Sequence, residues 1–152
     1  MVPSLPLVSQ HLPLAYAAVR ARTASLDPAD LVMAHIAATK LHDPRIEVLC
    51  GDIETIEIPR RYDCCVVYNA FPHFPDPQRL ITRLAELLAP GGRLTVAHGM
   101  SLEALRRRHA GAAQPVSRPM LQPEELAALM RPALTVDTML SDEEKYVVSA
   151  HL

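Results

Sequence analysis

Residues 61–98 constrain the fold most, because they contain the signals of a strand, a loop, a helix, a turn and a second strand. Tyr62 to Tyr68 is a short apolar and β-branched run, which is typical of a parallel strand covered on both faces. Three prolines in the six positions 72–77 make the next stretch irregular, since proline lacks a backbone donor and restricts the residue before it. The segment therefore predicts a complete βαβ unit.

The helix of this unit is expected to begin after the proline-rich loop, with Asp76 as its N-cap and Pro77 at its first position. Pro90-Gly91-Gly92 should end it, with Gly91 or Gly92 supplying the positive φ of a helix C-terminus, and residues 93–98 should form the second strand. The apolar residues at helical spacing share one face: Leu80, Ile81, Leu84, Leu87 and Leu88.

A right-handed crossover makes the two strands parallel, so the loops 69–74 and 98–101 should face one crevice. In open α/β sheets ligands bind outside the carboxyl ends of the strands, and these two loops are the expected place for chemistry.

The remaining chain continues the alternation of strands and helices. Three strands (4–9, 22–26, 45–49) and two helices (10–21, 29–41) are expected before this unit. After it we expect a helix capped by Ser101 and running to about His109, a loop at 110–120, a helix from Pro123 to about Met130, and strands 134–140 and 144–152 joined at Ser141-Asp142. The order predicts one α/β domain over residues 1–152, with a doubly wound, mostly parallel sheet and a closing antiparallel hairpin.

Composition narrows the class of protein. The net charge is -2, with 49% hydrophobic and 21% charged residues, which gives no electrostatic case for a nucleic-acid or membrane partner. The opening segment lacks the early positive charge of a signal peptide, and no run approaches the roughly 18 apolar residues of a membrane span. Cys50, Cys64 and Cys65 have no metal-ligand spacing, so we expect reduced core thiols in a cytoplasmic protein.

Four short motifs lie in a consistent order: LDP at 26–28, GDIE at 51–54, YDCCVVYNAFPHFPD at 62–76 and LLAPGGRLTVAH at 87–98. With them the chain resembles the class I S-adenosylmethionine-dependent methyltransferases, in particular the small bacterial type 11 group, from about Arg22 onward. The resemblance implies a Rossmann-like methyltransferase fold, S-adenosyl-L-methionine as the cofactor, and methyl transfer to a small-molecule acceptor.

The resemblance also implies roles for individual residues. Asp27 stands where the family binds the ribose hydroxyls, Asp52 where it meets the adenine amino group, and Asn69 where it lines the methionine end and the acceptor pocket. The alternatives are a helix cap for Asp27, a turn carboxylate for Asp52 and a loop-capping amide for Asn69. The implied cofactor-binding set is Asp27, Pro28, Asp52, Ile53, Asn69, Ala70 and Phe71.

The chain departs from the family at its beginning. The family's first strand ends in a glycine-rich turn, but residues 1–11 contain no glycine and the first one in the chain is Gly51. We therefore expect the first strand to be absent or degenerate and the domain to be truncated at its N-terminus. A missing strand would expose sheet edges and favour a homo-oligomer.

Histidines supply the candidate catalytic groups. His73, His98 and His109 fall near the predicted crevice, and His73 or His98 could serve as a general base for a poorly nucleophilic acceptor. Loop packing and metal binding are the alternatives, but no short motif of the HxxxH kind occurs, so no metal site is predicted.

Two classes of function remain open from the sequence. The first is S-adenosylmethionine-dependent methyl transfer, and the second is a non-catalytic methyltransferase-like binding or partner subunit, or an inactive fragment. A nicotinamide-binding Rossmann protein is disfavoured, because its GxGxxG motif is absent.

Overall fold

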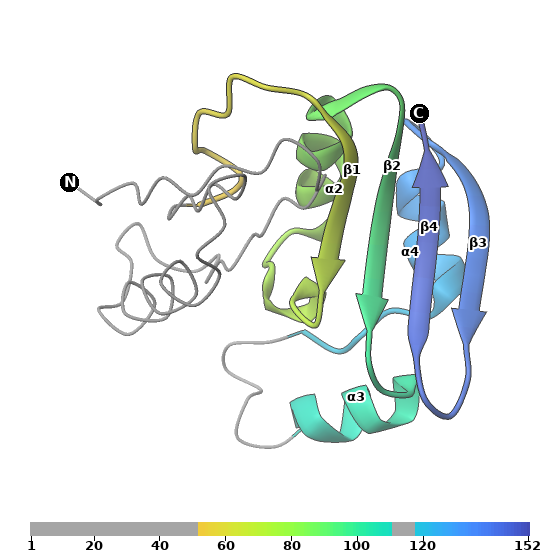
Figure 1. Cartoon of the computed structure of the whole chain (residues 1–152). Helices are drawn as coiled ribbons and strands as arrows, with labels where there is room; N and C mark the ends of the chain where they lie inside the picture. Colours follow the sequence, from red (N-terminus) through yellow and green to blue (C-terminus); the bar gives the residue numbers. More distant parts are fainter. Residues whose placement is uncertain (1–51, 111–117) are drawn as a thin grey trace, which may run out of the picture.

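The computed structural model describes residues 52–110 and 118–152, which form an α/β arrangement of a sheet and helices, as expected (Figure 1). The elements in chain order are β1 (Tyr62–Tyr68), the short 3₁₀ helix η1 (Phe71–His73), α2 (Pro77–Glu86), β2 (Leu88–His98), α3 (Leu102–Ala110), α4 (Pro123–Met130), β3 (Thr135–Ser141) and β4 (Tyr146–His151). The strands and helices expected before β1 lie outside the described residues.

The described strands form one four-stranded sheet in the order β1-β2-β4-β3. β1 and β2 pair in parallel, which confirms the predicted βαβ unit, and β4 pairs antiparallel with both β2 and β3. β1, β2 and β3 consequently point the same way and end at one edge, the lower edge in Figure 1. We call this the carboxyl edge.

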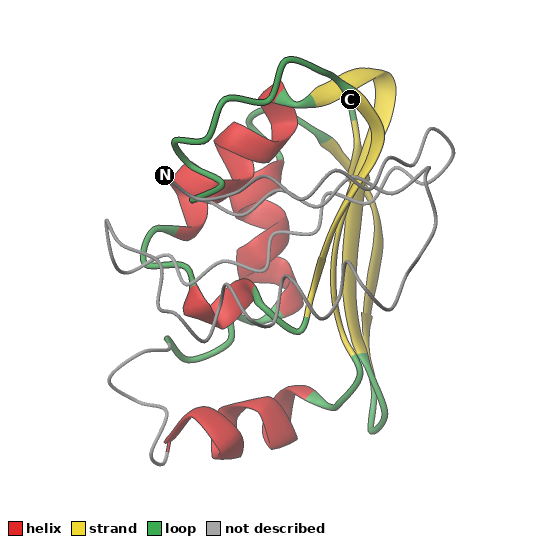
Figure 2. Ribbon diagram, turned by 60° about the vertical axis from the view of Figure 1, so that its left-hand side comes forward, coloured by secondary structure: helices red, strands yellow, loops and turns green. Residues whose placement is uncertain are grey.

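Two helices cover one face of this sheet. α2 and α4 pack on the same side of the strands and against each other, as Figure 2 shows from the side. The core between the two layers follows the strand alternation, with Leu94 and Val96 of β2 beside Val148 and Ala150 of β4, all fully buried. α3 lies at the carboxyl edge instead of on the sheet face, so it can wall a site there.

The start of α2 matches the prediction. Asp76 is the N-cap, its carboxylate accepts a hydrogen bond from the Arg79 backbone N–H at 3.0 Å, and Pro77 occupies the first turn. Leu80, Ile81 and Leu84 are fully buried on the inner face, as their spacing indicates.

The end of this helix differs from the prediction. α2 ends at Glu86, and β2 already begins at Leu88, so Pro90-Gly91-Gly92 lies inside the strand and does not terminate the helix. The register moves two residues along β1, from Tyr62 to Cys64, but five along β2, from Leu88 to Arg93. The prolyl-glycyl segment is thus a bulge that takes up the additional residues, and the positive φ of Gly91 (74°) belongs to that bulge.

The C-terminal part agrees with the predicted helices and hairpin within one or two residues. α4 has the predicted bounds and a capping box between Gln122 and Glu125. The expected antiparallel hairpin is present, although its turn extends to Lys145, because the Asp142 N–H donates to the Lys145 carbonyl at 3.0 Å. Within the described residues no helix is long and apolar enough to cross a membrane.

Candidate functional site

Asn69 connects the two loops that the sequence places at the crevice. It follows β1 with a left-handed backbone, φ 53°. Its N–H donates to the Ala97 carbonyl at 3.0 Å, which extends the pairing with β2, and its side-chain Oδ1 accepts a hydrogen bond from the Gly99 N–H at 3.1 Å. The chain leaving β1 is therefore fixed against the chain leaving β2, as the crossover argument predicts.

The loop after Asn69 is folded back into the protein. Phe71 and Phe74 are 3% and 1% exposed, so both rings pack in the core. Ala70, between Asn69 and the first turn of η1, is half-buried and packs against the core. The Pro72 carbonyl accepts a hydrogen bond from the Arg118 N–H at 2.8 Å, which joins this loop to the segment before α4.

Asp52 organises a tight turn ahead of β1. Its Oδ1 accepts a hydrogen bond from the Glu54 N–H at 2.9 Å, and its carbonyl accepts from the Ile56 N–H at 2.7 Å. The Arg83 guanidinium on α2 donates to the Ile53 and Ile56 carbonyls at 3.3 and 2.8 Å, so the turn is attached to the helix layer. Asp52 is half-buried, whereas the Ile53 side chain is 4% exposed and belongs to the core.

The histidines occupy different environments. His98 ends β2 at 2% exposure, and its ring packs edge-on against the Tyr146 ring with centroids 5.9 Å apart. His73 ends η1 and is half-buried. The side chain of His109, and Asp27 and Pro28, lie outside what the structure describes. Among the described residues no group of three or more His, Cys, Asp or Glu side chains could hold a metal ion.

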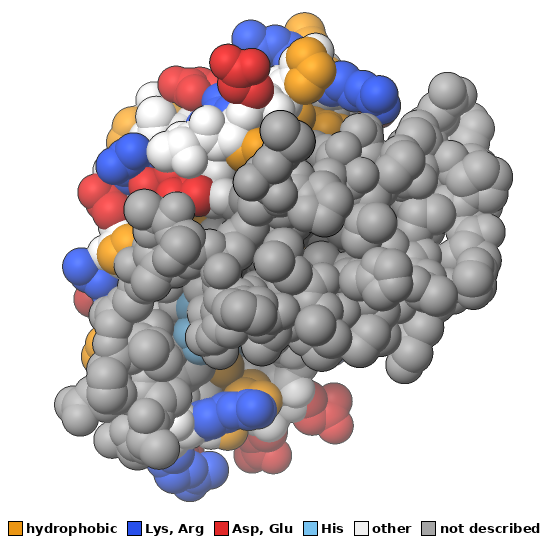
Figure 3. All heavy atoms as spheres, turned by 90° about the vertical axis from the view of Figure 1, so that its left-hand side faces the viewer, with side chains coloured by type: hydrophobic (Ala, Val, Ile, Leu, Met, Phe, Trp, Pro, Cys, Tyr) orange, Lys and Arg blue, Asp and Glu red, His pale blue; other side chains and the backbone are white. Residues whose placement is uncertain are grey.

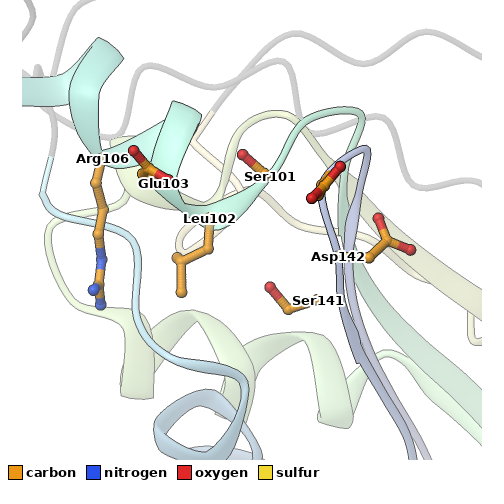
Figure 4. Close-up of a pocket in the computed structure, with 7 residues that line it drawn as sticks. Ser101, Leu102, Glu103, Arg106, Ser141 and Asp142 are labelled. Carbon is orange, nitrogen blue, oxygen red and sulfur yellow. The ribbon is translucent and has the colours of Figure 1, made fainter.

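A groove at the carboxyl edge was not anticipated from the sequence. It has a volume of about 610 Å³ and lies between the start of α3 and the β3–β4 turn (Figure 4). Its lining residues are Ser101, Leu102, Glu103, Arg106, Ser141, Asp142 and Glu143. The sequence predicts Ser101 only as a helix cap, and that cap is present, since the Ala104 N–H donates to Ser101 Oγ at 3.2 Å. The signal that could have found the groove is the strand topology. β4 is antiparallel to both β2 and β3, so β3 ends at the same edge of the sheet as β1 and β2.

Comparison with known proteins connects this architecture to a family. The family model described as "Methyltransferase domain" matches residues 8–96, more than half of the 152-residue chain. A 62-residue stretch is 34% identical to malonyl-[acyl-carrier protein] O-methyltransferase of Priestia megaterium, which covers 41% of this chain and 23% of that protein.

Solved structures share the fold. The N-methyltransferase NodS of Bradyrhizobium japonicum, in complex with S-adenosyl-L-homocysteine, superimposes with a TM-score of 0.58 at 18% identity, over 80% of this chain and 61% of NodS. A SAM-dependent methyltransferase of Thermotoga maritima gives a TM-score of 0.57 at 21% identity, over 79% of this chain and 68% of its own. These matches confirm the expected Rossmann-like methyltransferase fold.

The chain thus spans less than two thirds of the length of NodS and of the curated relative. The family model extends from residue 8 to Val96 in β2, so its match includes nearly all of the βαβ unit that carries the resemblance. The chain belongs to the methyltransferase-domain family, which is part of the class I methyltransferases, and the cofactor of this family is S-adenosylmethionine.

Proposed function

We propose that this chain binds S-adenosylmethionine at the carboxyl ends of β1 and β2 and transfers its methyl group to a small-molecule acceptor in the cytoplasm. The observation that carries the proposal is the Asn69 Oδ1 to Gly99 N–H hydrogen bond, at 3.1 Å. It holds together the two loops that border the crevice where ligands of open α/β sheets bind. The family membership supports the same reaction.

The residues present suit the adenosine end of this cofactor. The Asp52 turn uses Oδ1 for its own backbone, and Oδ2 is the oxygen that would accept a hydrogen bond from the adenine amino group. Ala70 is a small half-buried side chain beside Asn69, and we include it in the proposed set. Asp27 and Pro28 complete the proposed set on the ribose side, with Ile53 and Phe71 supporting it from the core.

Methyl transfer needs positioning more than acid-base chemistry. The cofactor supplies an electrophilic methyl group, and the protein's task is to hold the acceptor in line with it and to exclude water. A base is required only where the acceptor must lose a proton. We assign that role first to half-buried His73, and only second to His98, because His98 is 2% exposed and packed on Tyr146.

Charge supports a small molecule as the partner. The net charge of the chain is -2, and Figure 3 shows basic and acidic side chains mixed among the described residues of the face it displays. A nucleic acid or an anionic membrane surface is normally bound by a continuous basic patch. We therefore include neither as a partner, and we retain self-association as a part of the proposal.

Calorimetric titration with S-adenosylmethionine and S-adenosylhomocysteine tests this function. We expect micromolar binding that is weakened about tenfold by Asp52→Asn, since one hydrogen bond to the adenine amino group is worth about 1.4 kcal/mol. The amide keeps an oxygen for the turn but replaces Oδ2 by a donor. Asp27→Ala should abolish binding, and Glu57→Gln, an exposed acid elsewhere, should leave it unchanged.

The contrary result is equally specific. Absence of heat with both ligands, from a sample whose circular dichroism shows a folded α/β protein, would reject the catalytic proposal. The alternative of a non-catalytic methyltransferase-like subunit would then apply.

A further inference from the structure

The groove at the carboxyl edge lies on the opposite side of β2 from the proposed cofactor crevice. One wall is the first turns of α3, which follows β2 after three residues, and the other is the turn between β3 and β4. Figure 4 shows Leu102 on the helix wall and Ser141 on the turn wall. A ligand seated here would therefore reach the chain that follows β2, which Asn69 ties to the crevice.

The turn wall carries the carboxylates of Asp142 and Glu143. The Asp142 carboxylate accepts hydrogen bonds from the Glu144 and Lys145 N–H groups, both at 2.8 Å, and these bonds lower its pKa, so it stays ionised. Glu143 is exposed and has no ion-pair partner among the described residues. Glu103 on the other wall is engaged by Arg107 at 2.8 Å, so the available carboxylates are those of the turn.

The helix wall carries a positioned cation. The Arg106 Nε and Nη2 both donate to the Met120 carbonyl, at 3.2 and 3.1 Å, which fixes the plane of the guanidinium. Neither bond uses Nη1, and no ion pair of Arg106 with a carboxylate is found among the described residues. A fixed guanidinium is well suited to a carboxylate ligand.

We propose that this groove binds the methyl acceptor through a zwitterionic group, with its ammonium at Asp142 and Glu143, its carboxylate at Arg106 and its aliphatic part against Leu102. The role of the ligand as methyl acceptor rests on the proposed function. The binding of a zwitterion in the groove does not. A volume of about 610 Å³ falls within the usual range of small-molecule sites. Opposite charges on opposite walls favour a ligand that carries both signs over one that carries either alone.

The test measures the affinity of the full chain for β-alanine, 4-aminobutanoate and 6-aminohexanoate. Saturation-transfer NMR and calorimetry detect the binding, with and without S-adenosylhomocysteine. Hexanoate and hexylamine are the singly charged probes. We expect at least one amino acid of the series to bind about tenfold more tightly than either of them, and less tightly as salt is raised.

Two matched pairs of variants locate the site. Glu143→Gln and Arg106→Gln should each weaken the zwitterion about tenfold. Their neighbours Glu144→Gln and Arg108→Gln, which do not line the groove, should leave binding unchanged, and circular dichroism checks that all four fold.

The outcomes separate the two proposals. Zwitterion binding without any S-adenosylhomocysteine binding would support the groove and reject methyl transfer. Cofactor binding with no preference for the zwitterions, or with a preference that Glu143→Gln and Arg106→Gln leave intact, would overturn the groove assignment and leave the methyltransferase proposal standing.

Discussion

Asn69 has the most demanding backbone geometry at the carboxyl edge. A φ of 53° is tolerated by asparagine and glycine but strains other side chains. The same residue supplies the hydrogen bond to Gly99, where an added Cβ would lie 2.6 Å from the Tyr68 phenol oxygen. The exposed Tyr68 side chain can move away from such a Cβ, so the conformational requirement in these loops is that of Asn69.

Substitutions at Asn69 separate conformation from hydrogen bonding. Asn69→Ala should lower the free energy of unfolding by about 2 kcal/mol, from left-handed strain and the lost Gly99 bond together. Asn69→Gly loses the bond but relieves the strain, so a loss of about 1 kcal/mol is expected. Urea unfolding measures both, and equal losses would show that the backbone conformation carries no cost.

The Tyr146 phenol is a buried polar group whose oxygen has no hydrogen-bond partner among the described residues. An unsatisfied buried group costs about 1–3 kcal/mol, so Tyr146→Phe should stabilise the protein by about 1 kcal/mol. Burial, and then Glu124 and Glu125, raise the pKa of Tyr146. Because the folded pKa is raised, the wild type should lose stability as pH rises above about 10, the unfolded value.

Chemical denaturation at neutral and alkaline pH tests this expectation. The phenyl ring of the Tyr146→Phe variant cannot ionise, so the alkaline loss of stability should be smaller in the variant than in the wild type. Tyr68→Phe is the control, since Tyr68 is 59% exposed and should change neither quantity. A destabilised Tyr146→Phe would mean that the hydroxyl has a partner, such as a bound water.

At the level of elements, the start of β2 is shaped by two glycines with different constraints. Gly91 has a positive φ of 74° and no atom within 4 Å of an added Cβ, whereas a Cβ on Gly92 would lie 2.8 and 2.9 Å from the Ala89 and Tyr62 carbonyl oxygens. Gly91→Ala should therefore cost about 1 kcal/mol through strain alone. Gly92→Ala must displace backbone atoms and should lower the free energy of unfolding by about 2–3 kcal/mol. Urea unfolding of the two variants measures both losses. The reverse ranking would contradict the bulge geometry.

An ion pair links β2 to β3 across the intervening β4. The Arg93 guanidinium donates to both Asp137 carboxylate oxygens, at 2.8 and 2.6 Å, and to Ser149 Oγ of β4 at 2.9 Å. The register irregularity between Val136 and Thr138 is where Asp137 lies. Hydrogen bonds from Arg93, and then from Thr138, hold the pKa of Asp137 below its usual range.

This pair predicts a pH dependence of stability. Because the folded pKa is lowered, its contribution is present above about pH 4, the unfolded value, and is lost as pH falls further. Asp137→Asn should lower Tm at neutral pH, and the gap from wild type should close in acid. Asp63→Asn, an exposed acid on β1, is the control and should show no such gap. A constant gap at all pH values would exclude the ion pair as its cause.

The elements could be predicted from the sequence where local chemistry decides them. Asp76-Pro77 and Pro123 mark the two helix starts, because a cap and an N1 proline act within one turn. Pro90-Gly91-Gly92 misled the prediction, since the same residues suit a helix end and a bulge, and the pairing of Tyr62 with Leu88 decides between them. The groove could not be found this way, because its walls come from residues about 40 positions apart.

At the scale of the whole molecule, the core joins the sheet to α2 and α4 as one packed unit. Cys65 lies within it at 0% exposure, and burial raises the pKa of its thiol to about 12. A buried thiol of this kind reacts only when the surrounding structure opens. Cys65 thus reports on the unfolding of the whole described core, whereas half-buried Cys64 beside it reports on local opening.

We expect maleimide labelling, resolved by tandem mass spectrometry, to modify Cys64 before Cys65 in the native protein. The Cys65 rate should increase with urea in parallel with global unfolding. If the chain binds S-adenosylhomocysteine, a concentration of 100 times its Kd should slow Cys65 labelling about 100-fold, because only the folded form is stabilised. Equal labelling of both cysteines without denaturant would contradict the packing described.

The position of β4 between β2 and β3 also affects how the protein can be made. β2 is complete once His98 has been synthesised, but its partner along the second edge is β4, residues Tyr146–His151. During translation β2 therefore waits for about 50 further residues with one edge unpaired, and such an edge is a template for pairing with another chain. A ribosome that pauses between α3 and β4 would lengthen this exposure, so synonymous codon choice in that interval should influence the yield of soluble protein.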